Sequence, residues 1–201
     1  MPLKVNPNRM ELLRLKRRLA VARRGHKLLE DKLEGLIQKF MEEVKNYKEL
    51  REEISEKFLS FLSLGCFTYL RIPSFIWRDL VLINEGETLL REKIVKEMNI
   101  PVSILNIENV YVPKYSFIET PETLDHLVFR WKDLLEGLIN LVNKERELLA
   151  LSEEIEKTKR RVNALEYKLI PQIEETVKYI TTKLEELERG NFIRLLRLKE
   201  S

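Results

Sequence analysis

Few side chains in this 201-residue sequence have the type and spacing that catalysis requires. The two histidines, His26 and His126, lie far apart, and no cysteine or histidine stands beside either at metal-ligand spacing. The adjacent carboxylates Glu153–Glu154 and Glu185–Glu186 could do acid/base chemistry only within a cleft, and such pairs are common on solvated helix faces. The six glycines are isolated, so no phosphate-binding loop is formed. We therefore expect a protein without a catalytic site, metal or cofactor.

The remaining signal is basic charge near both ends of the sequence. From Arg9 to Lys32, nine basic residues stand against three acidic ones, whereas the formal net charge of the whole chain is only +3. The other end interleaves basic and apolar residues: Arg189, Phe192, Arg194, Leu195, Leu196, Arg197, Leu198 and Lys199. A solvated basic face is one interpretation. Apolar residues among the charges favour a binding surface instead, because they would otherwise face water.

Cys66 is the only cysteine, so the chain cannot form an internal disulfide. Its neighbours Leu64, Phe67 and Leu70 predict a buried, inert thiol in a reducing, intracellular compartment. No stretch reaches the roughly 18 apolar residues of a membrane span. We expect no direct membrane insertion, so any membrane association would come through partners.

The elements that must position the basic ends are bounded by proline. Prolines at positions 2, 7, 73, 101, 113, 121 and 171 leave two long tracts, 8–72 and 122–200, around a middle segment, 73–121. Apolar residues in the first tract recur at alternating steps of three and four, the spacing of a coiled-coil seam. These positions are Leu12, Leu15, Leu19, Ala22, Leu29, Leu33, Leu36 and Phe40, with His26 as a polar seam residue that fixes the register. The seam continues less strictly to Phe61.

The second tract repeats this spacing from Leu148 to Leu187, with one irregularity. Around Leu169, Ile173 and Val177 the steps are four and four, beside Pro171. A four-residue step in excess is a stutter, which locally unwinds a coiled coil. We expect one continuous helix that is kinked near residue 171.

The sequence thus predicts a mainly α fold, a long antiparallel two-helix coiled coil forming a single elongated domain over residues 1–201. A parallel homodimer is the alternative, but it carries an association cost that the intramolecular hairpin avoids. In the hairpin the two basic stretches meet at one tip, and the longer second helix projects past the start of the first.

The middle segment is expected to be irregular or to contain a small β-hairpin. Leu80–Ile83 and Val102–Ile107 are predicted as short strands. Glu87–Met98 is predicted as a helical turn or two, and Asn84–Gly86 as a turn.

Two long stretches resemble the D subunit, the central rotor stalk of V-type and archaeal A-type ATPases. One is NPNRMELLRLKRRL (Asn6–Leu19) with ARRGHKLL (Ala22–Leu29); the other is RRVNALEYKLIP (Arg160–Pro171), followed by Glu188-Arg189 and by Phe192–Leu195. The family usually has a Val-Pro pair after a glycine-bearing turn in the middle, where this chain has Met98–Val102 without glycine.

The resemblance implies a non-catalytic shaft that transmits torque between the hexamer of A and B subunits and the membrane ion-translocating ring. The tip would enter the hexamer through Arg9, Arg14, Arg17, Arg18, Arg23, Arg24, Arg189, Phe192, Arg194, Leu195 and Arg197. The opposite part would bind the small F subunit and sit on the funnel-shaped C (d) subunit that joins the ring. Candidate contacts with the F subunit are Ile54, Phe58, Phe61, Phe67 and Trp77. The chain would belong to the peripheral sector on the cytoplasmic side of the membrane.

Two other functions use the same elements. A coiled-coil tether or chaperone-like arm would share the seam but gives no reason for basic, apolar-studded ends to meet. A nucleic-acid-binding hairpin would use the basic tip, but only Phe192 lies among the basic C-terminal residues, without interleaved aromatics. We expect no nucleic-acid partner.

Overall fold

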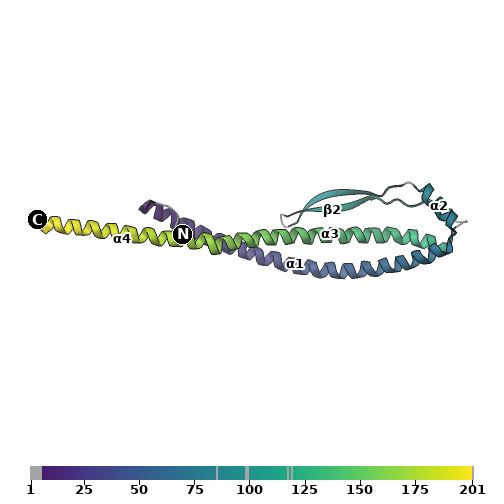
Figure 1. The fold of residues 1–201 in the computed structure, drawn as a ribbon, viewed down its shortest axis with the longest axis horizontal. Helices are drawn as coiled ribbons and strands as arrows, with labels where there is room; N and C mark the ends of the chain where they lie inside the picture. The colour runs from purple at the N-terminus through teal and green to yellow at the C-terminus, as the bar shows by residue number, and fades with distance from the viewer. Residues whose placement is uncertain (1–5, 85, 98–99, 117, 119, 201) are drawn as a thin grey trace. The chain divides into compact units, whose positions relative to one another are not determined.

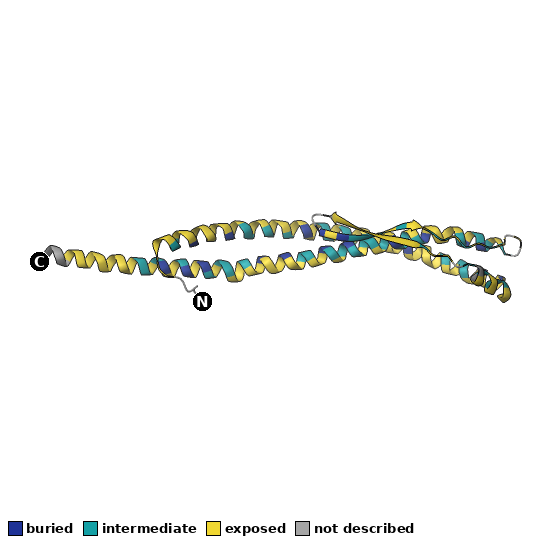
Figure 2. Cartoon of the chain, turned by 90° about the horizontal axis from the view of Figure 1, so that it is seen from above, coloured by how far each residue is buried: buried dark blue, intermediate teal, exposed yellow. Residues whose placement is uncertain are grey.

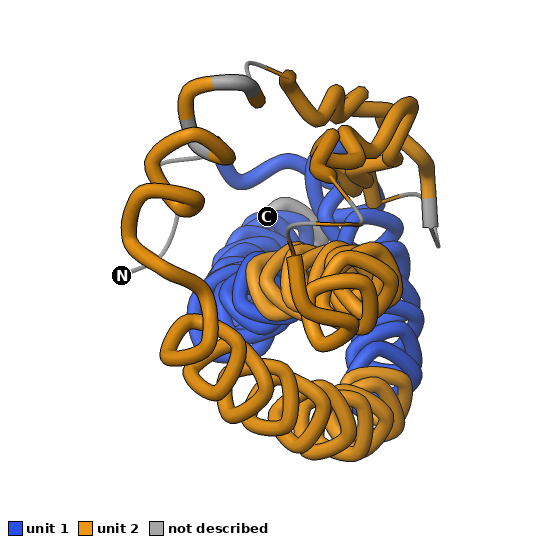
Figure 3. Tube along the Cα trace, turned by 90° about the vertical axis from the view of Figure 1, so that its right-hand side faces the viewer, with its two compact units in different colours: residues 1–37, 155–201 blue, residues 38–154 orange. Residues whose placement is uncertain are grey.

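The structure is a computed structural model that describes residues 6–200 except 85, 98–99, 117 and 119; the side chains of residues 81, 83, 97 and 197–200 also lie outside the description. The elements in chain order are α1 (Arg9–Arg71), α2 (Ser74–Ile83), β1 (Leu89–Glu97), β2 (Ile100–Asn109), α3 (Glu122–Ala164), the π-helix η1 (Leu165–Leu169) and α4 (Ile170–Glu200) (Figure 1). The chain divides into two compact units, residues 1–37 with 155–201 and residues 38–154 (Figure 3). We call them the first and the second unit.

The bounds of α1 follow from its flanking residues. Asn8 precedes the helix: its backbone carbonyl accepts a hydrogen bond from the Leu12 N–H at 3.0 Å, and its side chain accepts one from the Met10 N–H at 3.4 Å. The helix ends at Arg71, two residues before Pro73, because a residue that precedes proline is disfavoured in the helical region. The predicted first tract is therefore one α-helix of 63 residues.

The core of the first unit consists of predicted seam residues from both α1 and α4. Leu15, Ile173 and Ile180 form a buried cluster, and further seam residues pack against it: Leu12, Leu19, Leu169, Val177 and Leu184. The later part of α4 lies against the earlier part of α1, so the two helices run antiparallel. This confirms the predicted fold class for the helical part of the chain.

The irregularity of the second seam coincides with the π-helix η1. Here the Ile170 N–H bonds to the Leu165 carbonyl, five residues back, so one turn holds an additional residue. Pro171 follows directly; its ring would clash with a carbonyl four residues back in a regular α-helix, and it has no N–H to donate. The wider turn absorbs the irregularity, and both Leu169 and Ile173 stay on the seam. The helix is continuous from α3 through α4, as expected, and the kink stays a prediction.

The second unit contains the other half of the helix pair. Ile54 is buried on α1, and its side chain packs over Gly137 of α3, where an added Cβ would lie 3.5 Å from Ile54 Cγ1. Phe61 and Trp131 pack with ring centroids 5.9 Å apart. Lys144 of α3 donates to Glu43 of α1 and to Glu147 of its own helix, both at 2.9 Å. The pairing is again antiparallel.

The middle segment contains the predicted hairpin, but two of its elements were predicted wrongly. Leu80–Ile83, expected as a strand, is the end of helix α2, and Glu87–Met98, expected as helical, mostly belongs to strand β1. β1 and β2 pair antiparallel from Leu90 opposite Ile107 to Glu97 opposite Ile100. The charged, helix-favouring residues of β1 are strand because the ladder with β2 overrides their local preference. Strand β2 contains the predicted strand Val102–Ile107.

Asn84 ends α2 and ties it to the chain after β2. Its side-chain amide donates to the Leu80 carbonyl at 2.7 Å and to the Lys114 carbonyl at 3.0 Å, while its oxygen accepts from the Tyr111 hydroxyl at 2.8 Å. Of the predicted turn, Glu85 lies outside the described residues. Gly86 lies against the Tyr111 ring so closely that a Cβ at this position would collide with it.

The apolar run around Cys66 was expected to bury its thiol, and no apolar run was expected to cross a membrane. Cys66 is exposed, so the prediction of a buried thiol was wrong: its neighbours Phe67 and Leu70 are themselves exposed, and Thr68 occupies the buried face of α1 instead. Within the described residues, no single helix has the length and apolarity needed to cross a membrane; only α1 together with Ser74–Leu80, a pair bent by 118°, reaches them jointly.

Candidate binding tip at the chain ends

The first unit brings the two basic stretches together, as the sequence predicted for an antiparallel hairpin. Arg9, the first residue of α1, forms an ion pair with Glu188 of α4. One level further along, Arg23 Nη2 lies 2.6 Å from Glu174 Oε1. Both pairs are exposed and add little stability, but they agree with the antiparallel register that the buried cluster sets. We call the exposed residues of Arg9–Arg24 and Arg189–Leu196 the tip.

Beyond its pairing with Arg9, α4 has no described α1 residue beside it. α1 begins at Arg9 whereas α4 continues from Glu188 to Glu200. From Glu185 to Leu196 every residue is exposed, which is the stretch of continuous yellow at the C-terminal end in Figure 2. This stretch includes large apolar side chains, among which Phe192 is 63% exposed and Leu195 65%. Exposed apolar residues gathered in this way are typical of an interaction surface.

The predicted tip residues are on the surface wherever their side chains are described. These are Arg9, Arg14, Arg17, Arg18, Arg23, Arg24, Arg189, Phe192, Arg194 and Leu195. The side chain of Arg197 lies outside the described part of α4. The structure therefore presents the predicted basic and apolar residues together.

The arginines of α1 differ in how far they are already engaged. Arg9 and Arg23 hold α4 through carboxylates, Arg14 lies 3.7 Å from Glu11 of its own helix, and the Arg24 Nε donates to the Ala20 carbonyl at 3.4 Å. Arg17 and Arg18 form no ion pair with any residue that the structure describes. Arg9 and Arg23 are thus already paired with carboxylates of α4, a difference among the arginines that sequence reasoning did not predict.

The two histidines, which could in principle do chemistry, lie beside carboxylate side chains of the helices. His26 lies half-buried between the helices, with Nδ1 3.7 Å from Glu30 and Nε2 3.8 Å from Glu166 of η1. This placement agrees with a polar seam residue. His126 is exposed and lies 3.8 Å from Glu122 on its own helix. Among the described residues no group of histidine, cysteine and carboxylate side chains could hold a metal ion.

The candidate contacts with the F subunit are all in the second unit, but they are unequally exposed. Phe58 and Phe67 are exposed, and the Arg71 guanidinium lies 4.3 Å from the centre of the Phe67 ring. Ile54 is buried against α3, while Phe61 packs on Trp131 and Trp77 on Tyr69, with ring centroids 5.6 Å apart in the second pair. Phe58 and Phe67 are therefore the members of the set that a partner can reach.

Two polar groups of the second unit have shifted pKa values. Burial, then the hydrogen bond to Asp125 and its charge, raises the pKa of Tyr115 to about 12. Burial acts to lower the pKa of Lys144, but its hydrogen bonds and ion pairs with Glu147 and Glu43 outweigh this and raise it overall. Lys144 is thus held as a cation between the two helices.

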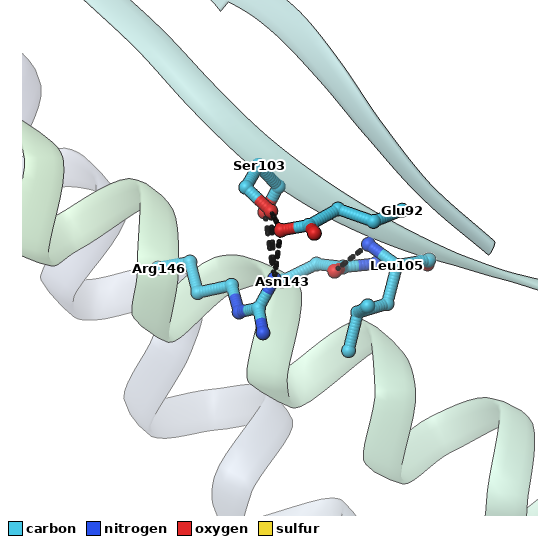
Figure 4. Close-up of polar contacts among 5 residues, drawn as sticks. All are labelled: Glu92, Ser103, Leu105, Asn143 and Arg146. Carbon is cyan, nitrogen blue, oxygen red and sulfur yellow. Dashed lines mark hydrogen bonds and ion pairs between the residues drawn. The ribbon is translucent and has the colours of Figure 1, made fainter. Parts of the chain in front are cut away.

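Sequence reasoning missed the residues that hold the hairpin on α3. Asn143 and Arg146 of α3 contact Leu105 and Ser103 of β2, and Arg146 also lies 3.5 Å from Glu92 of β1 (Figure 4). No motif marks these residues. A polar residue beside the seam is common on any helix, so the signal appears only once β2 is placed.

Comparisons with known proteins agree on one family. Residues 11–200 match the family model described as the D subunit of ATP synthase. The chain is 39% identical to the V-type ATP synthase D subunit of Acetivibrio thermocellus over 213 residues, covering 98% of this chain and 91% of the relative. It is 40% identical to the A-type ATP synthase D subunit of Thermococcus sibiricus over 209 residues, covering 98% and 94%. With the V-type ATP synthase D subunit of Enterococcus faecalis the identity is 39% over 202 residues, covering 98% and 96%.

Proposed function

The chain belongs to the family of ATP synthase D subunits, and from that premise we propose that it is the non-catalytic rotor shaft of a V/A-type rotary ATPase. It transmits torque between the hexamer of A and B subunits and the membrane ring that translocates ions. It works in the peripheral sector of the complex, on the cytoplasmic side of the membrane.

The observation that carries this proposal is the unpaired end of α4 beside the basic start of α1. Apolar residues such as Phe192 and Leu195 stand in water there, among arginines. Such a surface fits insertion into the central cavity of a ring better than exposure to solvent.

The form of the contacts suits a shaft that must turn. A rotor has to leave each angular position, so one very deep binding minimum would stop it. Exposed arginines spread over two helices make several weak contacts, each worth about 0.2–1 kcal/mol on a surface. Two helices also give the ring an asymmetric insert, so each A–B pair meets a different face.

The second unit is proposed to contact the F subunit and the funnel-shaped C (d) subunit. Of the candidate residues, Phe58 and Phe67 are exposed and are the first to test. The buried Ile54 and the stacked Phe61 and Trp77 would support that surface from beneath.

The test is to neutralise the tip and measure assembly. Changing Arg14, Arg17, Arg18 and Arg194 together to glutamine removes four exposed charges and leaves the Arg9 and Arg23 pairs intact. We expect the affinity for a purified A–B hexamer to fall by about tenfold or more at low salt. The salt dependence of binding should become shallower.

A matched variant controls for charge alone. Lys45, Lys48, Arg51 and Lys132 are also exposed, and changing them to glutamine removes the same charge from the second unit. It should bind the hexamer nearly as the parent does. If the two variants bind equally, or if the tip variant keeps the parent's affinity at low and moderate salt, the proposed insertion of the tip is wrong.

A further inference from the structure

The outer edge of strand β2 faces α3. The side chain of Asn143 accepts a hydrogen bond from the Leu105 N–H at 2.8 Å and donates one to the Leu105 carbonyl at 2.9 Å (Figure 4). Both main-chain groups of Leu105 therefore point away from β1. In an antiparallel pair the direction of these groups alternates along the strand, so Ser103 and Pro101 also direct their main chain outward.

None of these three outward positions of β2 is free to pair with another strand: two are hydrogen-bonded to α3, and the third is a proline. Leu105 is bonded to Asn143. The Ser103 carbonyl accepts a hydrogen bond from Arg146 Nη1 at 3.4 Å, and the same nitrogen donates to the Ser103 hydroxyl at 2.8 Å. Pro101 has no N–H, and proline is tolerated in strands where that group would face outward. No further strand can pair with this edge.

The outer edge of β1 is different. Glu92, Ile94 and Lys96 lie opposite Leu105, Ser103 and Pro101, so by the same alternation their main-chain groups point outward on the other side of the hairpin. No hydrogen bond between described residues reaches these groups. Every side chain from Leu89 to Lys96 is exposed. The hairpin is thus blocked on one edge and open on the other.

The side chains of β1 indicate what could pair there. Glu92 is engaged by Arg146 and Ser103, and Arg91 pairs with Glu108 at 2.7 Å. The charges left without an ion pair among the described residues are those of Lys93 and Lys96. Between them lies Ile94, which is 70% exposed. Because side chains alternate between the two faces of a strand, Lys93 and Lys96 lie on opposite faces, and Ile94 shares the face of Lys96. The complement is a strand with an acidic side chain opposite each lysine and apolar side chains between them, in the order acidic–apolar–apolar–acidic.

A second copy of the chain fits this edge less well. Antiparallel pairing of β1 with β1 about Ile94 would place Lys93 opposite Val95, and Lys96 opposite Glu92, which Arg146 and Ser103 already engage. Lysines on an edge strand also discourage non-specific pairing. An acidic strand would supply both lysines with carboxylates that a second copy lacks.

We propose that the open edge of β1 is a strand-addition surface for an extended acidic–apolar segment of a partner protein. The segment would join the hairpin as a third strand and bond to the outward main-chain groups of Glu92, Ile94 and Lys96. This inference goes beyond the proposed function, since a shaft needs only its helices.

The first experiment uses the full-length isotope-labelled protein and a blocked synthetic peptide with a glutamate–valine–valine–glutamate segment, which matches Lys93 to Lys96. Amide exchange measured by NMR should slow at Glu92, Ile94 and Lys96 when the peptide binds. The amides of Lys93 and Val95 already face β2 and should exchange as before. A peptide with lysine in place of both glutamates should bind at least about tenfold more weakly, because like charges oppose each other across the new pair.

A pair of variants separates the main-chain contact from the side chain. Ile94→Pro removes one outward N–H, whereas Ile94→Thr changes the side chain and keeps it. We expect Ile94→Pro to weaken peptide binding by about tenfold relative to Ile94→Thr, the effect of one lost hydrogen bond with its register. Unchanged signals from Val95 and Val102, which lie opposite each other, would verify that the hairpin is intact. Equal binding by both variants, equal binding of both peptides, or no binding of the acidic peptide would overturn the proposal.

Discussion

Ile173 and Ile193 are the same residue type on the same helix, but their surroundings differ. Ile173 is fully buried in the cluster with Leu15 and Ile180, whereas Ile193 is 50% exposed. We expect Ile173→Ala to lower the free energy of unfolding by about 2–5 kcal/mol, because it leaves a cavity in the seam. Ile193→Ala should change it by less than about 0.5 kcal/mol.

Urea unfolding followed by far-ultraviolet circular dichroism measures both values. Similar losses in the two variants would mean that α4 does not pack on α1 through Ile173. An effect of Ile193→Ala on hexamer binding alone is compatible with its place in the tip.

Tyr115 makes the stability of the second unit sensitive to alkaline pH. Its pKa is raised to about 12 in the folded chain, first by burial and then by Asp125, whereas an unperturbed tyrosine ionises near about 10. The folded state therefore keeps a proton that the unfolded state releases. This contribution is fully present below about pH 10 and is lost as pH rises toward 12.

The corresponding measurement is chemical unfolding of the parent and of Tyr115→Phe between pH 8 and pH 11.5. The parent should lose more stability over this range than the variant does. Tyr69→Phe, at an exposed tyrosine of the same unit, is the control and should follow the parent. A parallel decline in the parent and Tyr115→Phe would contradict the assignment.

At the scale of elements, the π-helix η1 explains how α4 keeps its seam after an excess residue. Removing one residue inside η1 would convert that turn to a regular α-helix and leave Ile173 and Ile180 facing α1. Pro171 must be changed as well, because its ring fits the wider turn and not the regular one. We expect the variant that lacks Lys168 and carries Pro171→Ala to unfold at nearly the same temperature as the parent protein.

Deletion of Lys178 combined with Pro171→Ala is the matched control, since both deletions remove one exposed lysine. Lys178 lies in a regular part of α4. Its deletion therefore rotates Ile180 and the residues after it by roughly 100° about the helix axis, away from α1. Several buried side chains would leave the seam, and thermal unfolding should begin at a distinctly lower temperature. Equal melting of the two variants would show that η1 does not absorb the excess residue.

The sequence was sufficient to predict the long helices but not the middle. The seam spacing is sustained over many turns, through residues such as Leu15, Leu36, Ile54 and Ile180. A pattern of this length predicts a helix even where single residues depart from it. In Leu80–Ile83 and Glu87–Met98 only a few residues indicate each element, and packing against other elements reversed both assignments. Contacts such as Asn143 with Leu105 depend on that packing, so no local pattern could have indicated them.

The binding tip was predictable for a different reason. Its basic and apolar residues could be read directly, and antiparallel pairing alone decides that Arg9 and Arg189 lie at the same end. Composition could not indicate which arginines form ion pairs within the chain. Arg9 and Arg23 pair with carboxylates of α4 only because of the register in which α1 and α4 pack. The burial of Cys66 was misjudged because apolar neighbours in sequence were taken as a core, whereas they face outward.

At the scale of the whole molecule, the proposed function predicts rotation of the chain within its complex. Cys66 is exposed and is the only cysteine, so a biotin–maleimide label on the purified chain reports one position. After reconstitution with A–B hexamers fixed to a surface, a streptavidin bead at Cys66 should turn in one direction when ATP is added.

Cys66→Ser supplies the control for non-specific attachment and should carry no beads. Complexes that hydrolyse ATP while labelled beads stay at one angle would exclude the rotor role. Such a result would leave the family membership and the affinity of the tip for the hexamer untouched, because neither depends on movement.

The end of α4 beyond Glu188 has a thermodynamic consequence. Helices of this length are marginal in water on their own, and here no described residue of α1 supports them. We expect its amides to exchange quickly with deuterium in the isolated chain and slowly once the hexamer surrounds it. Part of the attraction between shaft and ring would then offset the cost of ordering this segment, which lowers the net affinity.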